Sequence, residues 1–179
     1  MALSKIDAAN FLTGTIPQGN VANASLGAVT ALPGAIATGK VLQVVNTEFQ
    51  TSFTTTSSSA VDTGIAVSIT PSATNSRILL ETNIPQRTEE NVYVSFYIYR
   101  QINGGGYSEL DRLDQSNHYY LNNDFQTIYY GKKIDTTHNT TNQIDYKIYT
   151  HIQGGGSGVT LCPDGVGQLA NFTAFEIGA

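Results

Sequence analysis

The chain has 179 residues, a formal net charge of −5 and a pI near 5.0, and only 13% of its residues are charged. This length suits one domain with an appendage, and the acidic balance argues against a polyanionic partner, so we expect no nucleic-acid binding. The single cysteine, Cys162, cannot form an intrachain disulfide and is interpreted as a small apolar side chain.

Uncharged polar residues replace the missing charges. A composition rich in Ser, Thr, Asn and Gly is typical of extracellular and virion β-proteins. The first residues lack the apolar run of a signal peptide, and no apolar stretch is long enough to span a membrane, so we expect no membrane insertion. Assembly onto a virus particle, followed by lysis of the host, would carry such a protein outside the cell.

Residues 1–40 differ in texture from the rest of the chain. Ala, Gly, Asn and Thr dominate, and Gly14, Pro17 and Pro33 prevent a long helix. Single aliphatic residues recur every three to five positions, too sparsely for a core of their own. We predict an extended anchoring arm that becomes ordered by winding along neighbouring copies or by lying on another protein, and the alternative is a flexible leader. The expected attachment residues of the arm are Leu3, Ile6, Phe11, Leu12 and Ile16.

From Val41 onward, alternating apolar residues and glycine-rich turns predict β-strands. Pro85 is expected to end one of these strands, and residues 116–123 and 135–142 are expected to be loops. The pattern, with no convincing helix, predicts an all-β antiparallel jelly-roll β-sandwich over residues 41–179, preceded by the arm. The predicted strands are Val41–Phe49, Phe53–Thr56, Gly64–Thr70, Ser76–Ile84, Asn91–Gln101, Tyr107–Leu113, Phe125–Ile134, Gln143–Gln153, Val159–Cys162 and Leu169–Ile177.

The segment Asn91–Gln101 is predicted to be the central strand. At a period of two, its aliphatic residues and Phe96 share one face, while Tyr93, Tyr97 and Tyr99 share the other. Tyrosine is large and amphipathic, and it is enriched where proteins meet. The sequence therefore predicts that these three tyrosines form an oligomer interface.

Motifs that would carry chemistry are weak. Gly34 to Lys40 matches G-x-x-x-x-G-K, but Val41 replaces the required Ser or Thr and a strand follows instead of a helix, so we interpret the match as chance. The histidines lack metal-ligand spacing. Asp111, Asp114 and Asn117 lack the glycine and the bidentate glutamate of a calcium loop, and a solvated hairpin edge is the preferred interpretation.

An enzyme that depolymerises glycans would need two carboxylates paired across a cleft. The acidic residues of this chain lie mainly in loops and singly. We therefore expect no catalytic residues, no cofactor and no metal site.

The polar loops suggest a binding surface. Aromatic rings and hydrogen-bonding groups there are suited to a host-surface glycan, so residues of these loops are candidates for receptor contact. The alternative is that tyrosine packs well on β-surfaces without binding anything. The candidate contact residues are Tyr107, His118, Tyr119, Tyr120 and His138.

Several segments resemble virion proteins of tailed bacteriophages, especially of marine and cyanobacterial phages. The resemblance runs from Leu3 to Leu26, where the sequence reads LSKIDAANFLTGTIPQGNVANASL, and continues through GKVLQVV, VSITPS and SRILL to the terminal FTAFEIG. It covers both ends of the chain and the first strands, whereas residues 85–165 show only a general β pattern.

This resemblance implies a trimeric fibre, knob or decoration subunit. It implies an N-terminal attachment arm and a C-terminal β-domain similar to the jelly rolls of complement C1q and tumour necrosis factor. We therefore expect a homotrimeric structural protein of the virion, anchored to capsid or tail proteins by residues 1–40. The alternative is a carbohydrate-binding adhesin.

Overall fold

The structure, a computed structural model, describes residues 40–88, 92–118, 125–154, 158–163 and 168–178. The predicted arm, including all five of its expected attachment residues, lies outside this part of the chain, as do Tyr119 and Tyr120. Two compact units divide the chain near residue 37, and the description below concerns the second, Thr38–Ala179.

The described residues form strands and no helix. Most of the strands begin and end within three residues of the predicted positions. They are β1 (Val41–Phe49), β2 (Phe53–Thr55), β3 (Val61–Ile69), β4 (Arg77–Thr88), β5 (Val92–Ile102), β6 (Ser108–His118), β7 (Phe125–Asp135), β8 (Ile144–Gly154), β9 (Val159–Leu161) and β10 (Ala170–Ile177).

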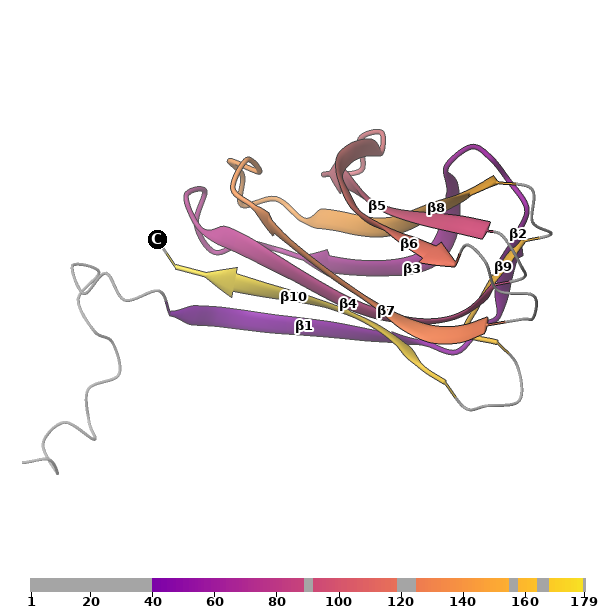
Figure 1. The fold of residues 1–179 in the computed structure, drawn as a ribbon. Coiled ribbons are helices and arrows are strands. Elements are labelled where there is room, and N and C mark those ends of the chain that lie inside the picture. Colours follow the sequence, from indigo (N-terminus) through magenta and orange to yellow (C-terminus); the bar gives the residue numbers. More distant parts are fainter. Residues whose placement is uncertain (1–39, 89–91, 119–124, 155–157, 164–167, 179) are drawn as a thin grey trace, which may run out of the picture. The chain divides into compact units, whose positions relative to one another are not determined.

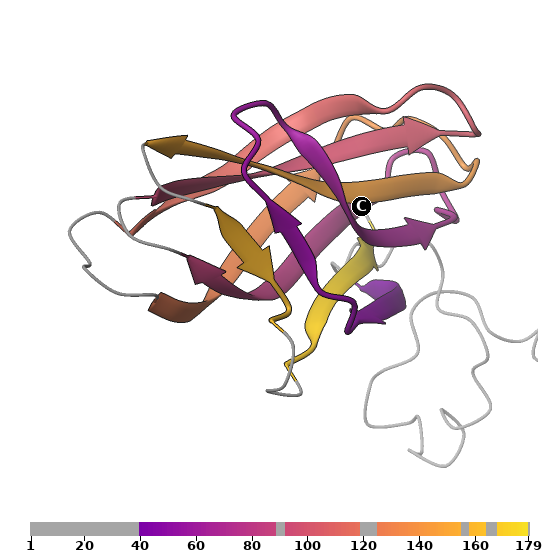
Figure 2. The ribbon, with the colours of Figure 1, turned by 90° about the vertical axis from the view of Figure 1, so that its right-hand side faces the viewer.

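The strands make two antiparallel sheets stacked as layers (Figures 1 and 2). The first sheet has six strands in the order β1-β10-β4-β9-β2, with β7 paired to the other edge of β4. The second has four strands in the order β3-β8-β5-β6. The chain passes repeatedly from one sheet to the other, so strands adjacent in a sheet are mostly distant in sequence. The predicted all-β jelly-roll sandwich is confirmed.

Alternation along the strands places the core between the sheets. In β5, Val92, Val94, Phe96 and Ile98 are at most 1% exposed, as the sequence predicts. The core of the six-stranded sheet includes Tyr129, whose ring stacks on Phe96 with the centroids 4.4 Å apart. Cys162 is buried, which agrees with its interpretation as a small apolar side chain, and burial raises the pKa of its thiol.

The prediction that Pro85 ends a strand is wrong, because β4 continues through it to Thr88. Strand β4 pairs with β10 up to Asn83 and with β9 from Gln86 onward, so Pro85 lies where its partner changes. The carbonyl of Pro85 accepts a hydrogen bond from the backbone N–H of Cys162 at 2.8 Å. Proline is tolerated at this junction because the ladder on that side of β4 is interrupted there.

The hairpin between β5 and β6 turns at Asn103 and Gly104, as predicted, and both residues have positive φ angles, 51° and 72°. Strand β6 is longer than expected, however. It runs to His118, which pairs with Val92, so the predicted loop over residues 116–123 begins later than the sequence suggested. The polar residues at the end of β6 stay in the strand because β5 pairs with them up to His118.

A buried carboxylate joins the two sheets. Asp135, at the end of β7, is 1% exposed and accepts hydrogen bonds from Arg100 of β5 and from the hydroxyl of Tyr146 of β8, both at 2.8 Å. Its other oxygen accepts the backbone N–H of Thr137 at 2.8 Å. Burial alone would raise the pKa of Asp135, but these hydrogen bonds and the charge of Arg100 outweigh it and hold the pKa below its ordinary value.

Candidate functional site

The most unusual surface of the described residues is the outer face of the six-stranded sheet. Within the part of the chain that the structure describes, large apolar side chains are exposed only on its strands β1 and β7. Such residues usually face a core or a partner, and a contiguous group of them marks an interaction surface. They are Val41 at 57%, Leu42 at 45%, Val44 at 54%, Ile128 at 43%, Tyr130 at 69% and Ile134 at 47% exposure.

The strand register aligns four apolar side chains across this face. Val44 of β1 pairs with Phe175 of β10, Phe175 pairs with Leu79 of β4, and Leu79 pairs with Ile134 of β7. Adjacent strands are about 4.8 Å apart, so the four residues form one continuous stripe about 14 Å long. We call Val44, Phe175, Leu79 and Ile134 the apolar row.

A polar row lies two residues further along the same strands. Thr173 donates a hydrogen bond to the side chain of Asn46 at 2.7 Å, and Lys132 forms an ion pair with Glu81 at 3.3 Å. These four residues occupy consecutive strands from β1 to β7. The charges of this row are therefore matched within the chain.

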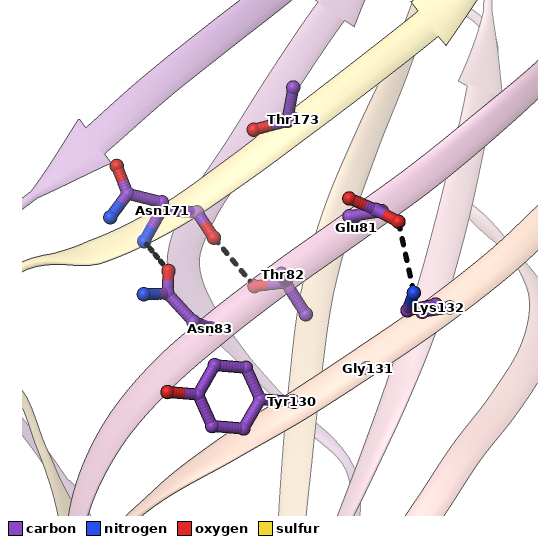
Figure 3. A pocket seen from close by; sticks show the side chains of 8 residues that line it. All are labelled: Glu81, Thr82, Asn83, Tyr130, Gly131, Lys132, Asn171 and Thr173. Atoms are coloured by element: carbon purple, nitrogen blue, oxygen red, sulfur yellow. Dashed lines mark hydrogen bonds and ion pairs between the residues drawn. The ribbon is translucent and has the colours of Figure 1, made fainter.

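Beyond the polar row, the face is hollowed. A shallow hollow of about 240 Å³ lies over β10, β4 and β7 (Figure 3). Asn83 accepts the backbone N–H of Asn171 at 2.9 Å, and the carbonyl of Asn171 accepts the hydroxyl of Thr82. The ring of Tyr130 stands beside Asn83, as Figure 3 shows. The full lining is Glu81, Thr82, Asn83, Tyr130, Gly131, Lys132, Asn171 and Thr173.

The chemistry of the hollow is that of a binding surface. Side-chain amides both donate and accept hydrogen bonds, and the Tyr130 ring offers an exposed flat face. Glu81 is the single carboxylate in the lining, so the hollow lacks the paired acids that glycoside hydrolysis requires. Among the described residues, no group of three His, Cys, Asp or Glu side chains is placed to hold a metal ion.

The predicted tyrosine interface lies on the other sheet. Tyr93, Tyr97 and Tyr99 do share the outer face of β5, and all three are half-buried. Tyr97 packs against His151 and Tyr99 stacks on Tyr149, with centroids 5.3 Å and 4.0 Å apart. Neighbouring strands of the same chain therefore cover part of these rings, and their role in an interface stays a prediction.

Two of the predicted receptor-contact residues, Tyr107 and His118, lie at opposite ends of one strand. Tyr107 precedes the first residue of β6 and His118 is its last, so about 35 Å of extended strand separates them. Tyr107 is half-buried, with the ammonium of Lys147 4.8 Å above its ring. The role of these residues in receptor contact stays a prediction.

His138 was predicted to contact a receptor, but its side chain is buried. Its side chain is 4% exposed, and its Nε2 lies 2.8 Å from the carbonyl oxygen of Ser76. Its Nδ1 lies 3.1 Å from the carbonyl oxygen of Thr140. The histidine joins two loops from inside, because a polar loop can still fold over one of its own side chains.

The apolar row and the hollow were not predicted. A local signal exists, since strands such as VLQVV and RILL carry apolar residues on both faces. The alignment of Val44, Leu79, Ile134 and Phe175 depends on pairing between distant segments of the chain. Val44 and Phe175, which pair directly, are 131 positions apart in the sequence. No local pattern contains that information.

Comparisons with known proteins found a partial structural similarity. A scan against family models found no match, and a search of curated proteins found none. Among solved structures, that of infectious bursal disease virus strain Gx has a TM-score of 0.44 at 12% identity over 78% of this chain and 39% of that one. A crystal structure of the VP2 subviral particle of this virus has a TM-score of 0.44 at 12% identity, over 78% and 38%.

A third solved structure, of a D431N mutant VP2 in T=1 particles of the same virus, has a TM-score of 0.45 at 11% identity. It covers 76% of this chain and 36% of that one. The chain thus spans less than half the length of each of these proteins. Identities this low do not assign it to their family.

Among the described residues, no helix is long and apolar enough to cross a membrane.

Proposed function

We propose that this chain is a structural protein of a bacteriophage particle, active as a homotrimeric fibre, knob or capsid-decoration subunit. Residues 1–40 attach it to capsid or tail proteins, and the sandwich forms the body of the subunit. Its work is mechanical: strand pairing and apolar burial hold the subunits on the particle. No enzymatic step is part of this proposal.

The observation that carries the proposal is the exposed apolar row. A β-sandwich that works alone covers the outer faces of its sheets with polar side chains. Here four adjacent strands present Val44, Phe175, Leu79 and Ile134 together, with the first and last about half exposed. This surface suits a protein that functions within an assembly, which is what the resemblance of the sequence to phage virion proteins implies.

The test is whether the chain belongs to the particle. Phage particles are purified by density gradient and washed in high salt, and the chain is quantified by mass spectrometry against the major capsid protein. We expect a fixed ratio to the capsid protein that survives the wash and corresponds to a copy number per particle divisible by three. A chain that stays in the lysate, or whose ratio varies between preparations, would contradict a virion role.

A second candidate function, glycan binding by an adhesin, is supported by the hollow. The exposed ring of Tyr130 and the amides of Asn83 and Asn171 are groups that bind the apolar face and the hydroxyls of a sugar. A volume of about 240 Å³ suits one monosaccharide unit. The two candidates compete, because both use the outer face of the six-stranded sheet.

The glycan candidate predicts saturation transfer from the full chain to methyl glycosides of glucose, galactose or N-acetylglucosamine in NMR. Tyr130→Ala should weaken this binding at least tenfold, since stacking on the ring is lost. Tyr107→Ala, which removes a tyrosine of the predicted receptor surface, is the matched control and should leave it unchanged. If no glycoside receives saturation, or if only Tyr107→Ala weakens it, the hollow is not the glycan site.

A further inference from the structure

We propose that a second copy of this chain packs on the outer face of the six-stranded sheet, over the apolar row. The inference deepens the proposed function, since it names the face and the partner for the assembly. It also replaces the tyrosine face of β5, which the sequence suggested, with a face of the opposite sheet.

The two outer faces differ in how much apolar surface they leave open. In the six-stranded sheet, the exposed group extends from the apolar row to Val41 and Leu42 at one end of β1. In the four-stranded sheet, no large apolar side chain of the described residues is exposed to this degree, and the rings of Tyr99 and Tyr149 stack on each other. The six-stranded face is therefore the one that gains more from being covered.

The size of this face suits a protein partner. Four strands about 4.8 Å apart, each about nine residues long at about 3.3 Å per residue, span roughly 600 Å² in projection. One protomer contributes about 800 Å² of accessible surface to a standard interface. The relief of the side chains raises the accessible area above the projected area, so one sheet face accounts for most of such an interface.

The charge of the face favours an identical partner. The whole chain carries −5, so two copies repel each other on average. Among the described outward positions of β1, β10, β4 and β7, two acidic residues, Glu48 and Glu81, stand with three basic ones, Arg77, Arg87 and Lys132. This face is near neutral, and it is therefore a place where copies of an acidic chain can meet without strong repulsion.

The polar row is compatible with burial. Glu81 and Lys132 pair with each other, and Asn46 and Thr173 share a hydrogen bond, so covering them leaves few groups without partners. A core of aliphatic side chains bordered by satisfied polar groups is the usual anatomy of an interface. The row and its polar border have this arrangement.

The test places a charge on the face and measures the mass of the full chain. The wild-type chain should have a defined oligomeric mass by light scattering and analytical ultracentrifugation at micromolar concentration. Val44→Lys and Ile134→Lys should each raise the dissociation constant at least tenfold, because an ammonium would be buried without a partner. Tyr97→Lys and Ser68→Lys, on the outer face of the other sheet, are the matched controls and should leave the mass unchanged.

Thermal unfolding of each variant shows whether its sandwich remains folded. Thiol labelling of cysteine variants is a second measurement of the interface, and it does not depend on introducing a charge. In the assembled protein, Val44→Cys should react with a maleimide at least tenfold more slowly than Ser68→Cys. A monomeric wild-type chain at 100 µM would overturn the inference, as would equal labelling of the two cysteines. The inference would also be overturned if Tyr97→Lys dissociated the oligomer and Val44→Lys did not.

The two proposals can fail separately. A monomeric chain that is nevertheless present in particles at a fixed ratio would contradict the second-copy interface and support the virion role. An oligomer that depends on Val44 and Ile134 but is absent from particles would support the second-copy interface and contradict the virion role.

Discussion

At the scale of single residues, the buried carboxylate of Asp135 links the two sheets. Its partners come from both sheets: Arg100 from β5 and Tyr146 from β8, with Asp135 itself at the end of β7. The Arg100 side chain is 18% exposed, and that of Asp135 is fully covered. Removing one member of a buried ion pair leaves the other charge without compensation.

Asp135→Asn should therefore lower the free energy of unfolding by about 3 kcal/mol at pH 7. The folded-state pKa of Asp135 is depressed, so its contribution is complete above the unfolded-state pKa of about 3.9 and is lost as the pH falls through the folded-state value. The difference between wild type and variant should shrink below about pH 4. Urea unfolding at fixed protein concentration between pH 3 and 7 measures it.

The control for this prediction is Glu81→Gln, which removes the carboxylate of an exposed pair with Lys132. Surface pairs contribute about 1 kcal/mol or less, so this variant should unfold nearly as wild type does. A similar small loss for Asp135→Asn would show that the network does not hold the sheets together.

At the scale of elements, β7 shows how one glycine leaves room for a core ring on the buried face of a strand. The core side of β7 carries Tyr129, and the outer side carries Ile128 and Tyr130, at 43% and 69% exposure. A Cβ at Gly131 would lie 2.9 Å from side-chain atoms of both Tyr129 and Leu113. The missing side chain thus makes room for the Tyr129 ring, which stacks on Phe96.

Gly131→Ala should destabilise the sandwich by about 1–3 kcal/mol, because the added methyl group overpacks the core against a ring that cannot move freely. Gly106→Ala is the matched control, since a Cβ there meets nothing within 4 Å. That variant should be neutral or slightly stabilising. Chemical denaturation of both variants decides the matter, and equal stabilities would mean that the core near β7 adapts without cost.

At the scale of the whole molecule, we propose separate tasks for the predicted arm and the sandwich. If residues 1–40 attach the protein to the particle, the double variant Phe11→Asp and Leu12→Asp should reduce incorporation into particles at least tenfold, because it adds two charges to apolar attachment positions. Its oligomeric mass should be unchanged, since the apolar row is intact. Quantitative mass spectrometry of purified particles and light scattering of the free protein measure the two effects.

Charges added at neighbouring arm positions provide the control. Ala22→Asp with Ala24→Asp changes the arm by the same net charge and spares the predicted attachment residues. If both double variants are incorporated like the wild type, attachment does not depend on the apolar residues of the arm. If the first one also loses its oligomeric mass, the arm contributes to assembly and not to attachment alone.

Local patterns predicted much of the fold but little of the candidate site. The alternation in β5 and β8 was sufficient to assign inward residues such as Phe96, Ile98 and Ile148, because burial between two sheets imposes a period of two. The same reasoning failed at His138 and Pro85. Their environments are set by a folded loop and by a change of strand partner, and neither is visible in neighbouring residues.

The sequence by itself determined the all-β class, most strand positions, the hairpin turn at Asn103 and Gly104, and the distinct texture of residues 1–40, because these follow from local alternation, turn chemistry and composition. Only the tertiary structure decided which outer face is apolar. Val44, Leu79, Ile134 and Phe175 are ordinary strand residues one at a time. They become a surface because long-range pairing sets four strands in register, and the energy that fixes this register comes from the opposite face, where the core is packed.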